Sequence, residues 1–341
     1  MIYIRADANS YIGMGHIMRC LSIADAARNN CQDVEFILAD DTVEELVENS
    51  GYKSIVLHSN YEHMEDELSL WPDNNPNIVI VDSYYVTNAY LMSLKKIFKN
   101  GIIIYIDDLL ASPYPVDVLI NYNIYARKKD YEELYYRCNN KPQFILGLKY
   151  IPLRKMFRGI EEKKQKEMVK DVLITTGGAD LEHIALSIVK ARPSNYTYHI
   201  LIGALNVDSD EIKELSSEMN NIIIHENVID MQSLISNMDI AVSAAGSTIY
   251  EICACGVPLI TYISADNQIE GAETIANIGL AKNIGDIREI SNFTSALFDE
   301  VAILASDYDK RKKVGKRMQK LIDGFGANRI VKEIIGNIAD N

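Results

Sequence analysis

One short stretch near the start of the sequence combines a histidine with two glycines. Residues 6–16 read Ala-Asp-Ala-Asn-Ser-Tyr-Ile-Gly-Met-Gly-His. Gly13 and Gly15, separated by one residue, let the backbone turn sharply and let a ligand approach it closely. His16 follows directly, and an imidazole can exchange a proton near neutral pH. The stretch therefore predicts an acid–base group at His16, and a turn residue without chemistry is the alternative interpretation.

A strand before this glycine loop and a helix after it would position His16. Residues 1–5 alternate in apolar character, and from residue 17 apolar side chains recur with the spacing of one helix face. The unpaired N–H groups and the positive dipole end of such a helix point back at the loop. Strand, loop and helix together would therefore place the histidine beside a bound ligand.

A second stretch, residues 243–251, carries the strongest chemical signal of the other half. It reads Ser-Ala-Ala-Gly-Ser-Thr-Ile-Tyr-Glu and follows a predicted strand. Ser247 or Thr248 can cap the next helix, whose free N–H groups and dipole suit a diphosphate. Glu251 lies about one turn further on the same helix face, where a carboxylate could accept both hydroxyls of a ribose. An ordinary capped helix with Glu251 facing solvent is the alternative interpretation.

Polar side chains end several predicted strands of the first half: Asp7, Asp82, Asp107, Asp108 and Asn121. In open α/β sheets ligands bind outside the carboxyl ends of the strands. Any one of these residues could instead cap a helix, since Asp and Asn are good caps. Their corresponding positions nevertheless predict a polar cleft.

The remaining pattern predicts an α/β protein with two similar halves. Strands of the first half are expected at 34–39, 53–57, 77–82, 101–106 and 117–121, with a helix at 42–50. The second half is expected to start with a strand at 170–174, a glycine loop at 175–180 and a helix at 181–191. Further strands are expected at 198–203, 222–225, 238–243 and 257–262, and helical character from residue 287.

A run of charged residues at 161–167 interrupts the pattern and is interpreted as a solvated connection between domains. The predicted organisation is an N-terminal Rossmann-like domain at 1–160, a C-terminal one at 168–320 and a helical tail at 321–341. A chain of 341 residues is long enough for two cores.

Composition narrows the class of function. The net charge of −14 would repel a phosphate backbone over most of the surface, which argues against nucleic acid as a partner. The five cysteines are odd in number and match no zinc spacing, so we expect reduced thiols and a cytoplasmic protein. We expect no targeting leader and no membrane span, because no uncharged apolar run reaches about 20 residues.

Together these residues resemble the UDP-2,4-diacetamido-2,4,6-trideoxy-beta-L-altropyranose hydrolase family of pseudaminic acid biosynthesis. The resemblance covers about residues 1–270. Its motifs, in order, are Arg5-x-Asp7, Ile12-Gly13-x-Gly15-His16, Arg19, Asp82-Ser83-Tyr84, Asp107-Asp108, Leu119-Ile120-Asn121-Tyr122-Asn123, Gly147-x-x-Tyr150-x-x-x-Arg154, Gly177-Gly178-x-Asp180, Ser243 to Glu251, and Asn267-Gln268. It implies an α/β protein of GT-B architecture, with two facing Rossmann-like domains and a cleft between them.

The resemblance also implies a reaction, namely hydrolysis at the anomeric carbon by C–O cleavage with inversion, which releases UDP and the free sugar. It implies no metal and no redox cofactor. His16 would activate or orient the attacking water, Glu251 would hold the ribose, and the loop Asn227 to Met231 would contact uracil, largely through its backbone. The turn formed by Ala245, Gly246, Ser247 and Thr248 would hold the diphosphate. The remaining substrate contacts would come from Asp7, Gly13, Gly15, Tyr84, Asn121, Tyr150, Arg154, Gly178, Asn267 and Gln268.

The implied setting is the biosynthesis of nonulosonic acid for surface polysaccharide or flagellin glycosylation. The UDP-sugar would be the partner, and the protein would be a monomer or a weak homo-oligomer. Three other functions stay open: a GT-B glycosyltransferase with a UDP-sugar donor, a UDP-sugar 2-epimerase, and a nucleotide-sugar binding protein without turnover. A basic, apolar patch for anionic lipid would favour a membrane-acting transferase, and the sequence has no such cluster. The retained His16 argues against a protein without turnover.

Overall fold

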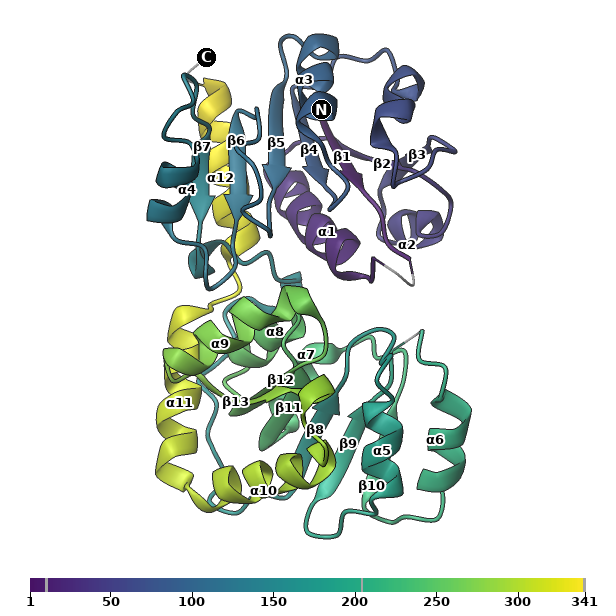
Figure 1. Ribbon diagram of the computed structural model, residues 1–341, viewed down its shortest axis with the longest axis vertical. Helices are drawn as coiled ribbons and strands as arrows, with labels where there is room; N and C mark the ends of the chain where they lie inside the picture. The colour runs from purple at the N-terminus through teal and green to yellow at the C-terminus, as the bar shows by residue number, and fades with distance from the viewer. Residues whose placement is uncertain (10–11, 204, 340–341) are drawn as a thin grey trace. The chain divides into compact units, whose positions relative to one another are not determined.

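The computed structural model describes residues 1–9, 12–203 and 205–339 (Figure 1). The chain divides into two compact units. Unit 1 comprises residues 1–155 and the C-terminal segment from Phe325, and unit 2 comprises residues 156–324. Ser10 and Tyr11 of the predicted glycine loop lie outside the described residues.

Unit 1 is built on a parallel sheet. Among its described residues, seven strands pair in the order β3-β2-β1-β4-β5-β6-β7. In chain order the elements are β1 (Ile2–Ala6), α1 (Gly15–Arg28), β2 (Val34–Leu38), α2 (Glu44–Asn49), β3 (Lys53–Val56), a 3-10 helix (Met64–Leu70), β4 (Ile78–Asp82), α3 (Asn88–Ile97), β5 (Ile102–Ile106), β6 (Val118–Asn121), α4 (Lys128–Leu134), β7 (Gln143–Leu146), a 3-10 helix (Leu148–Tyr150) and α12 (Gly326–Ala339). A further 3-10 helix (Lys155–Phe157) crosses the boundary between the units.

The centre of this sheet explains the continuous apolar runs in the sequence. All five residues of β1 and all five of β4 are buried. A parallel strand covered by helices on both faces needs apolar side chains in both directions. Because β1 and β4 pair in register, with Ala6 opposite Asp82, the polar residues that follow them meet at one edge of the sheet.

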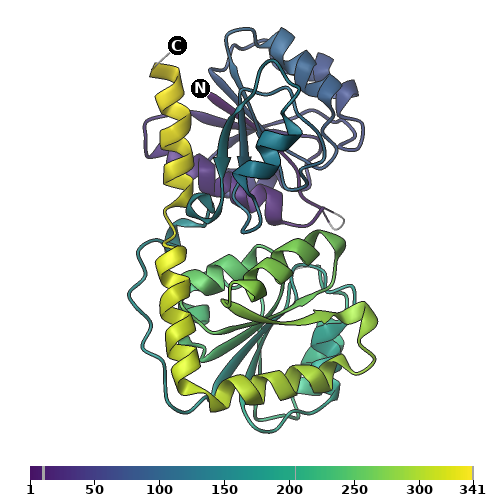
Figure 2. The same cartoon turned by 60° about the vertical axis from the view of Figure 1, so that its left-hand side comes forward.

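The last helix of the chain belongs to unit 1, whereas the sequence predicts a separate tail at 321–341. Helix α12 packs against α1 and the 3-10 helix Leu148–Tyr150, and Figures 1 and 2 draw it, in yellow, with the strands of unit 1. Its buried side chains are Ala327, Ile330, Val331 and Ile334. The close approach needs a glycine at its start, because a Cβ at Gly326 would lie 2.0 Å from the carbonyl oxygen of Ile151.

Unit 2 repeats the parallel α/β plan. Six strands among its described residues pair in the order β10-β9-β8-β11-β12-β13. The elements are β8 (Asp171–Thr175), α5 (Ile184–Lys190), β9 (Thr197–Leu201), α6 (Ser209–Ser216), β10 (Ile222–His225), α7 (Met231–Asn237), β11 (Ile240–Ala244), α8 (Thr248–Ala254), β12 (Leu259–Ile263), a 3-10 helix (Asp266–Gln268), α9 (Ile269–Asn277), β13 (Ala281–Asp286), a 3-10 helix (Ile287–Glu289), α10 (Phe293–Ser306) and α11 (Tyr308–Leu321).

The charged run at 161–167 lies within unit 2 rather than between the units. It forms neither helix nor strand, but it is tied to neighbouring helices. The Lys163 ammonium donates to the carbonyl oxygen of Ser236 at 2.6 Å, and the buried Arg311 of α11 donates to the carbonyl oxygens of Lys166 and Glu167 at 2.9 and 2.7 Å. The run is therefore an irregular segment that these hydrogen bonds hold against unit 2, and we call residues 161–167 the charged strap. No helix in the described part of the chain is long and apolar enough to cross a membrane.

Candidate functional site

His16 lies in the first turn of α1, where the helix leaves the glycine loop. Its side chain is only 4% exposed, and its Nδ1 atom lies 2.6 Å from the Oδ1 atom of Asp82 at the carboxyl end of β4. Nη2 of Arg19, which can only donate, lies 3.0 Å from the same Nδ1 atom. An ionised carboxylate only accepts hydrogen bonds, and its contact is the shorter of the two, so we assign the proton of a neutral imidazole to Nδ1. The Nε2 atom then carries the lone pair, which makes it the atom that can accept a proton.

Arg19, one turn further along α1, holds Asp82 from the other side. Its Nε atom donates to the Oδ2 atom of Asp82 at 2.5 Å, and its Nη2 atom donates to Oδ1. Burial alone would raise the pKa of Asp82, but the Arg19 guanidinium and His16 outweigh it and hold the pKa well below its usual range. Asp82 is therefore ionised beside His16 at neutral pH.

A second carboxylate completes this group. The Nη1 atom of Arg19 donates to the Oδ2 atom of Asp108 at 2.8 Å and to the hydroxyl oxygen of Tyr122 at 2.6 Å. The hydroxyl of Tyr84 donates to the same Asp108 oxygen at 3.3 Å, while its ring meets the His16 ring edge-on at 4.5 Å between centroids. We call these residues the His16 cluster: His16, Arg19, Asp82, Tyr84, Asp108 and Tyr122.

The two glycines before His16 have different reasons to be glycine. Gly13 has a φ of +76°, in the left-handed region that L side chains rarely adopt. Gly15 has no such constraint, and apart from its chain neighbours and the backbone of its own helix, no described atom lies within 4 Å of the position its Cβ would take. The space above Gly15 is open, as close approach of a ligand would require.

The resemblance places three residues around the sugar and phosphates that, in the structure, make hydrogen bonds or ion pairs to other residues of unit 1: Asp7, Asn121 and Tyr150. Asp7 is buried, pairs with Arg5 and accepts the N–H of Ala39 at 2.8 Å. The amide of Asn121 donates to the hydroxyl oxygen of Tyr131 at 2.9 Å. The hydroxyl of Tyr150 donates to the carboxylate of Glu333 at 2.9 Å. Arg154 is half-buried. Tyr84 is thus the member of this set in unit 1 that the structure brings to His16.

In unit 2, the predicted diphosphate turn joins the end of β11 to the start of α8. Ala245 is buried, Gly246 and Thr248 are half-buried and Ser247 is exposed. Ser247 occupies the cap position but makes no capping hydrogen bond within the described residues, so its side chain does not close the helix as expected. No described atom lies within 4 Å of a Cβ built on Gly246. Glu251 is half-buried on α8.

The other predicted residues of unit 2 follow the carboxyl ends of three strands of one sheet, β8, β10 and β12, which do not pair with one another. After β8, Gly178 has open space at its Cβ position, and the preceding Gly177 has a φ of +89°. After β10, Asn227 is exposed with a left-handed φ of +49°, and Met231 opens α7 as a buried residue. After β12, Asn267 is exposed and the Gln268 amide oxygen accepts the N–H of Ser264 at 2.9 Å.

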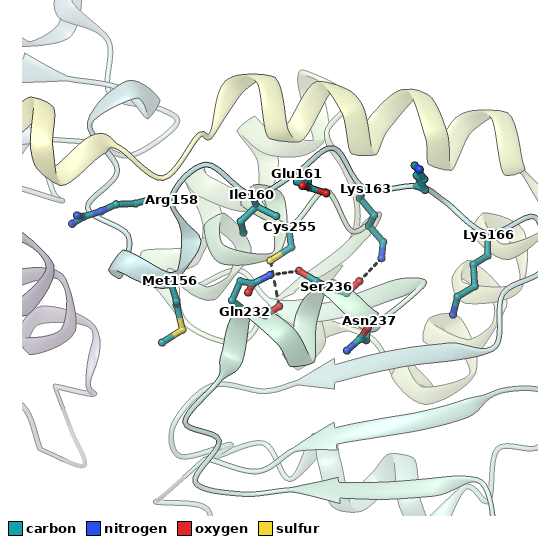
Figure 3. Close-up of a pocket in the computed structure, with 11 residues that line it drawn as sticks. Met156, Arg158, Ile160, Glu161, Lys163, Lys166, Gln232, Ser236, Asn237 and Cys255 are labelled. Atoms are coloured by element: carbon teal, nitrogen blue, oxygen red, sulfur yellow. Dashed lines mark hydrogen bonds between the residues drawn. The ribbon is translucent and has the colours of Figure 1, made fainter.

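A cavity of about 550 Å³ in unit 2 lies elsewhere, under the charged strap (Figure 3). In the described part of the chain its lining includes Arg158, Lys163, Lys166 and Cys255, and none of the predicted site residues. Figure 3 shows Lys163 pointing at Ser236, while Lys166 pairs with Asp239 at 3.0 Å. Two of its cations already have partners in the protein, so the strand ends rather than this cavity remain the candidate site.

Sequence patterns predicted that polar residues follow these strands, but they did not predict which of those side chains contact one another. The positions of Asp82 and Asp108 after buried strands, and of Arg19 one turn after His16, were the available signals. Their mutual contacts join residues 63 and 89 positions apart and depend on how β1, β4 and β5 pair. Among the described residues, no group of three or more His, Cys, Asp or Glu side chains could hold a metal ion.

Comparison with known proteins concerns the family and the architecture of the chain. The chain is 26% identical to the UDP-2,4-diacetamido-2,4,6-trideoxy-beta-L-altropyranose hydrolase of Campylobacter jejuni, over 71% of this chain and 85% of that protein. The resemblance to this hydrolase family is confirmed. The chain is also 22% identical to the spore coat polysaccharide biosynthesis protein SpsG of Bacillus subtilis, over 96% and 95% of the two chains. A protein of Methanocaldococcus jannaschii is 24% identical over 79% of this chain, and the match spans 57% of that protein.

The fold comparisons concern the architecture alone. Residues 171–323 match the glycosyltransferase family 28 C-terminal domain. MurG of Acinetobacter baumannii superposes with a TM-score of 0.66 at 12% identity, covering 98% of this chain and 99% of that one. The calicheamicin glycosyltransferase CalG4 gives 0.66 at 14% identity, covering 99% and 98%. The predicted GT-B class of two parallel α/β domains is confirmed.

Proposed function

We propose that this protein hydrolyses a UDP-linked diacetamido-trideoxy sugar at the anomeric carbon, releasing UDP and the free sugar. The observation that carries the proposal is the 2.6 Å contact with Asp82, which favours Nε2 of His16 as a proton acceptor in the residue that follows Gly15. The substrate follows from the name of the Campylobacter jejuni relative. The sugar's identity rests on that similarity.

The residues of unit 1 supply the base. Nε2 of His16 takes a proton from a water molecule as the water oxygen bonds to the anomeric carbon. The bond from that carbon to the diphosphate oxygen breaks, and its electron pair leaves with UDP. Asp82 stabilises the imidazolium that forms, and the proton passes to solvent afterwards. A single displacement of this kind inverts the anomeric configuration.

The residues of unit 2 would hold the leaving group. In the turn Ala245 to Thr248, the N–H groups of Ala245 and Gly246 already donate to the carbonyl oxygens of Tyr262 and Ala244. The N–H groups and hydroxyls of Ser247 and Thr248 would therefore meet the diphosphate, whose negative charge grows as the bond breaks. The Glu251 carboxylate would accept the ribose hydroxyls, and the loop from Asn227 to Met231 would present its backbone to uracil. Preorganised donors of this kind lower the barrier without a metal ion, and we propose a reaction without metal or redox cofactor.

A glycosyltransferase is the second candidate, because the solved structures with the same architecture include glycosyltransferases and residues 171–323 match a glycosyltransferase domain. In that case His16 would deprotonate an acceptor hydroxyl instead of water. The two candidates therefore differ in the nucleophile and share the base.

Incubation of the protein with the UDP-sugar in oxygen-18 water, with chelator and without acceptor, decides between them. Hydrolysis gives unlabelled UDP and a free sugar that carries the label. Intact UDP-sugar that still binds contradicts the hydrolase, and turnover restored by an added carbohydrate acceptor identifies a transferase. Loss of turnover with chelator contradicts the metal-free reaction.

The setting of the reaction is also a proposal. All five cysteines are unpaired in the structure, which supports a reducing compartment such as the cytoplasm. We place the reaction in the supply of a nonulosonic acid for surface polysaccharide or flagellin glycosylation, with the protein acting as a monomer or weak homo-oligomer.

A further inference from the structure

The contacts within the His16 cluster form a closed ring that begins and ends at His16. His16 contacts Asp82, Asp82 binds Arg19, and Arg19 binds Asp108. Asp108 accepts the hydroxyl of Tyr84, whose ring lies against His16. Asp108 does not touch His16 in these contacts, yet it binds Arg19, which contacts both His16 and Asp82, and Tyr84, whose ring contacts His16.

The cluster also has a definite charge. Two carboxylates face one guanidinium, because both Asp82 and Asp108 bind Arg19. The side chains of Arg19, Asp82 and Asp108 are 11%, 0% and 10% exposed, so water screens them weakly. Without Asp108, the Arg19 charge would be balanced by Asp82 alone, and no net negative charge would remain to favour an imidazolium at His16.

We infer that Asp108 is a positioning residue that neutralises Arg19, so that the charge of Asp82 serves the His16 base. Asp108 acts through Arg19 and Tyr84 and contacts no reacting atom. The inference deepens the proposed function, since it concerns the same base, but its central claim is about proton uptake by His16 and needs no substrate.

Three further groups complete the electrostatic surroundings of His16. Cys20 of α1 donates its thiol to Asp82 at 3.4 Å, and burial raises the pKa of that thiol, so it stays neutral. Tyr122 accepts from Arg19, and its pKa is likewise raised by burial. Asn123 donates to the second oxygen of Asp108 at 2.8 Å and carries no charge. Among the described contacts of the cluster, Arg19, Asp82 and Asp108 therefore carry the charges from which we argue proton uptake.

The test is a pH titration of the histidine signals by NMR in protein labelled with nitrogen-15 histidine. The chain has six histidines, and the His16 signal is identified by its loss in His16→Gln. Asp108→Asn keeps the shape of the side chain and removes its charge. We expect the midpoint of the His16 titration to move to lower pH, because the Arg19 charge is then balanced by Asp82 alone.

Two further variants separate charge from shape. Arg19→Gln should move the midpoint to higher pH, and the double variant Arg19→Gln/Asp108→Asn should bring it back towards that of the unmodified protein. Asp117→Asn is the matched control. Asp117 lies before the amino end of β6, whereas Tyr122 of the His16 cluster follows the carboxyl end, and Asp117 pairs with Lys95. Thermal melting of each variant shows whether the fold is kept.

The outcomes distinguish this inference from the proposed function. An unchanged midpoint in folded Asp108→Asn overturns the role of Asp108, even if the protein hydrolyses its substrate. A double variant with a midpoint further from the original than either single variant also overturns it. The expected shifts in a protein that turns over no UDP-sugar support the role of Asp108 and contradict the hydrolase.

Discussion

The Nδ1 atom of His16 and the Oδ1 atom of Asp82 lie 2.6 Å apart, although 66 residues separate them in the sequence. This contact is shorter than the 3.0 Å approach of the Arg19 Nη2 atom to the same nitrogen, so it favours the tautomer with its proton on Nδ1 and a lone pair on Nε2. It joins the start of α1 to the end of β4, the middle strand of the seven described in the sheet of unit 1.

Replacing either member of this pair should stop the chemical step. His16→Ala removes the base and should lower single-turnover UDP release by about 10²–10⁴-fold, the usual contribution of general base catalysis. Asp82→Asn should also lower it, by roughly 10²-fold or more, because an amide N–H at that position favours the tautomer with its proton on Nε2. UDP affinity, measured by calorimetry, should stay nearly unchanged. His63→Gln, an exposed histidine of the same unit, is the control. Near-original turnover in His16→Ala contradicts the mechanism.

Glu251→Ala should weaken the binding of UDP itself. Loss of hydrogen bonds from two ribose hydroxyls to a carboxylate costs about 1.5–3 kcal/mol, or roughly 10- to 100-fold in Kd. The matched control is Glu218→Ala, which removes an exposed carboxylate paired with Arg192 at 3.2 Å. Calorimetric titration with UDP checks both, and equal affinity of the two variants would remove Glu251 from the nucleotide site.

Gly246→Ala should separate ligand binding from stability. No described atom lies within 4 Å of the added methyl group, so the folded protein has room for it. A diphosphate lying on this turn would meet it, and overpacking by one methyl group costs about 1–3 kcal/mol, or roughly 5- to 150-fold in UDP affinity. Gly336→Ala in α12, also in open space, is the control and should leave UDP binding unchanged. Unchanged UDP affinity in Gly246→Ala would place the diphosphate elsewhere.

Sequence patterns predicted the elements that are continuous and apolar. The run at 78–82 is a buried strand because each of its side chains faces a covering layer. The strand Ala281–Asp286 escaped prediction, since the sequence Ala-Lys-Asn-Ile-Gly-Asp has neither alternation nor an apolar run and is ordered by pairing with β12. Likewise, the packing of α12 on α1 joins opposite ends of the chain, and no local pattern encodes that contact.

The same limit applies to the candidate site. His16 could be singled out because a glycine loop and a helix start meet at it, which is local information. Asp7 ends a strand in the same way as Asp82, yet it pairs with the buried Arg5, whereas Asp82 contacts His16. The difference between a packing carboxylate and one beside the base lies in which side chains the paired strands bring opposite it.

The buried ion pair between Arg5 and Glu67 should be costly to break. Arg5 donates from Nε and Nη2 to the two Glu67 oxygens at 2.8 and 2.9 Å, and both side chains are 0% exposed. Arg5→Met leaves Glu67 and Asp7 as buried charges without a counter-charge, and should lower the free energy of unfolding by about 3–5 kcal/mol.

Urea denaturation measures that loss, and Arg5→Met/Glu67→Met should recover part of it because the double variant removes one of the stranded charges. Lys190→Met breaks the exposed pair with Glu211 and should cost no more than about 1 kcal/mol. An Arg5→Met variant as stable as Lys190→Met would contradict the assignment of Arg5 as the counter-charge of this core.

Two histidines on neighbouring strands of unit 2 should make stability depend on pH. The Nδ1 atom of His199 lies 2.9 Å from the Nε2 atom of His225, and the rings stack with centroids 5.2 Å apart. Burial, and then the neighbouring His199, lowers the pKa of His225 in the folded protein. Above the unfolded value of about 6.5, His225 is neutral in both states and costs nothing. As the pH falls below that value, the unfolded chain takes up the proton first, so the free energy of unfolding decreases until the pH passes the folded pKa.

His225→Gln should therefore flatten the pH dependence of stability between about pH 6.5 and 5, the range below the unfolded value. Urea denaturation followed by circular dichroism at a series of pH values gives the slope for each variant. His63→Gln replaces an exposed histidine in unit 1 and should retain the original slope. His225→Gln removes one proton acceptor from the sheet and no other. An unchanged slope would therefore mean that the stacked pair does not couple proton uptake to unfolding.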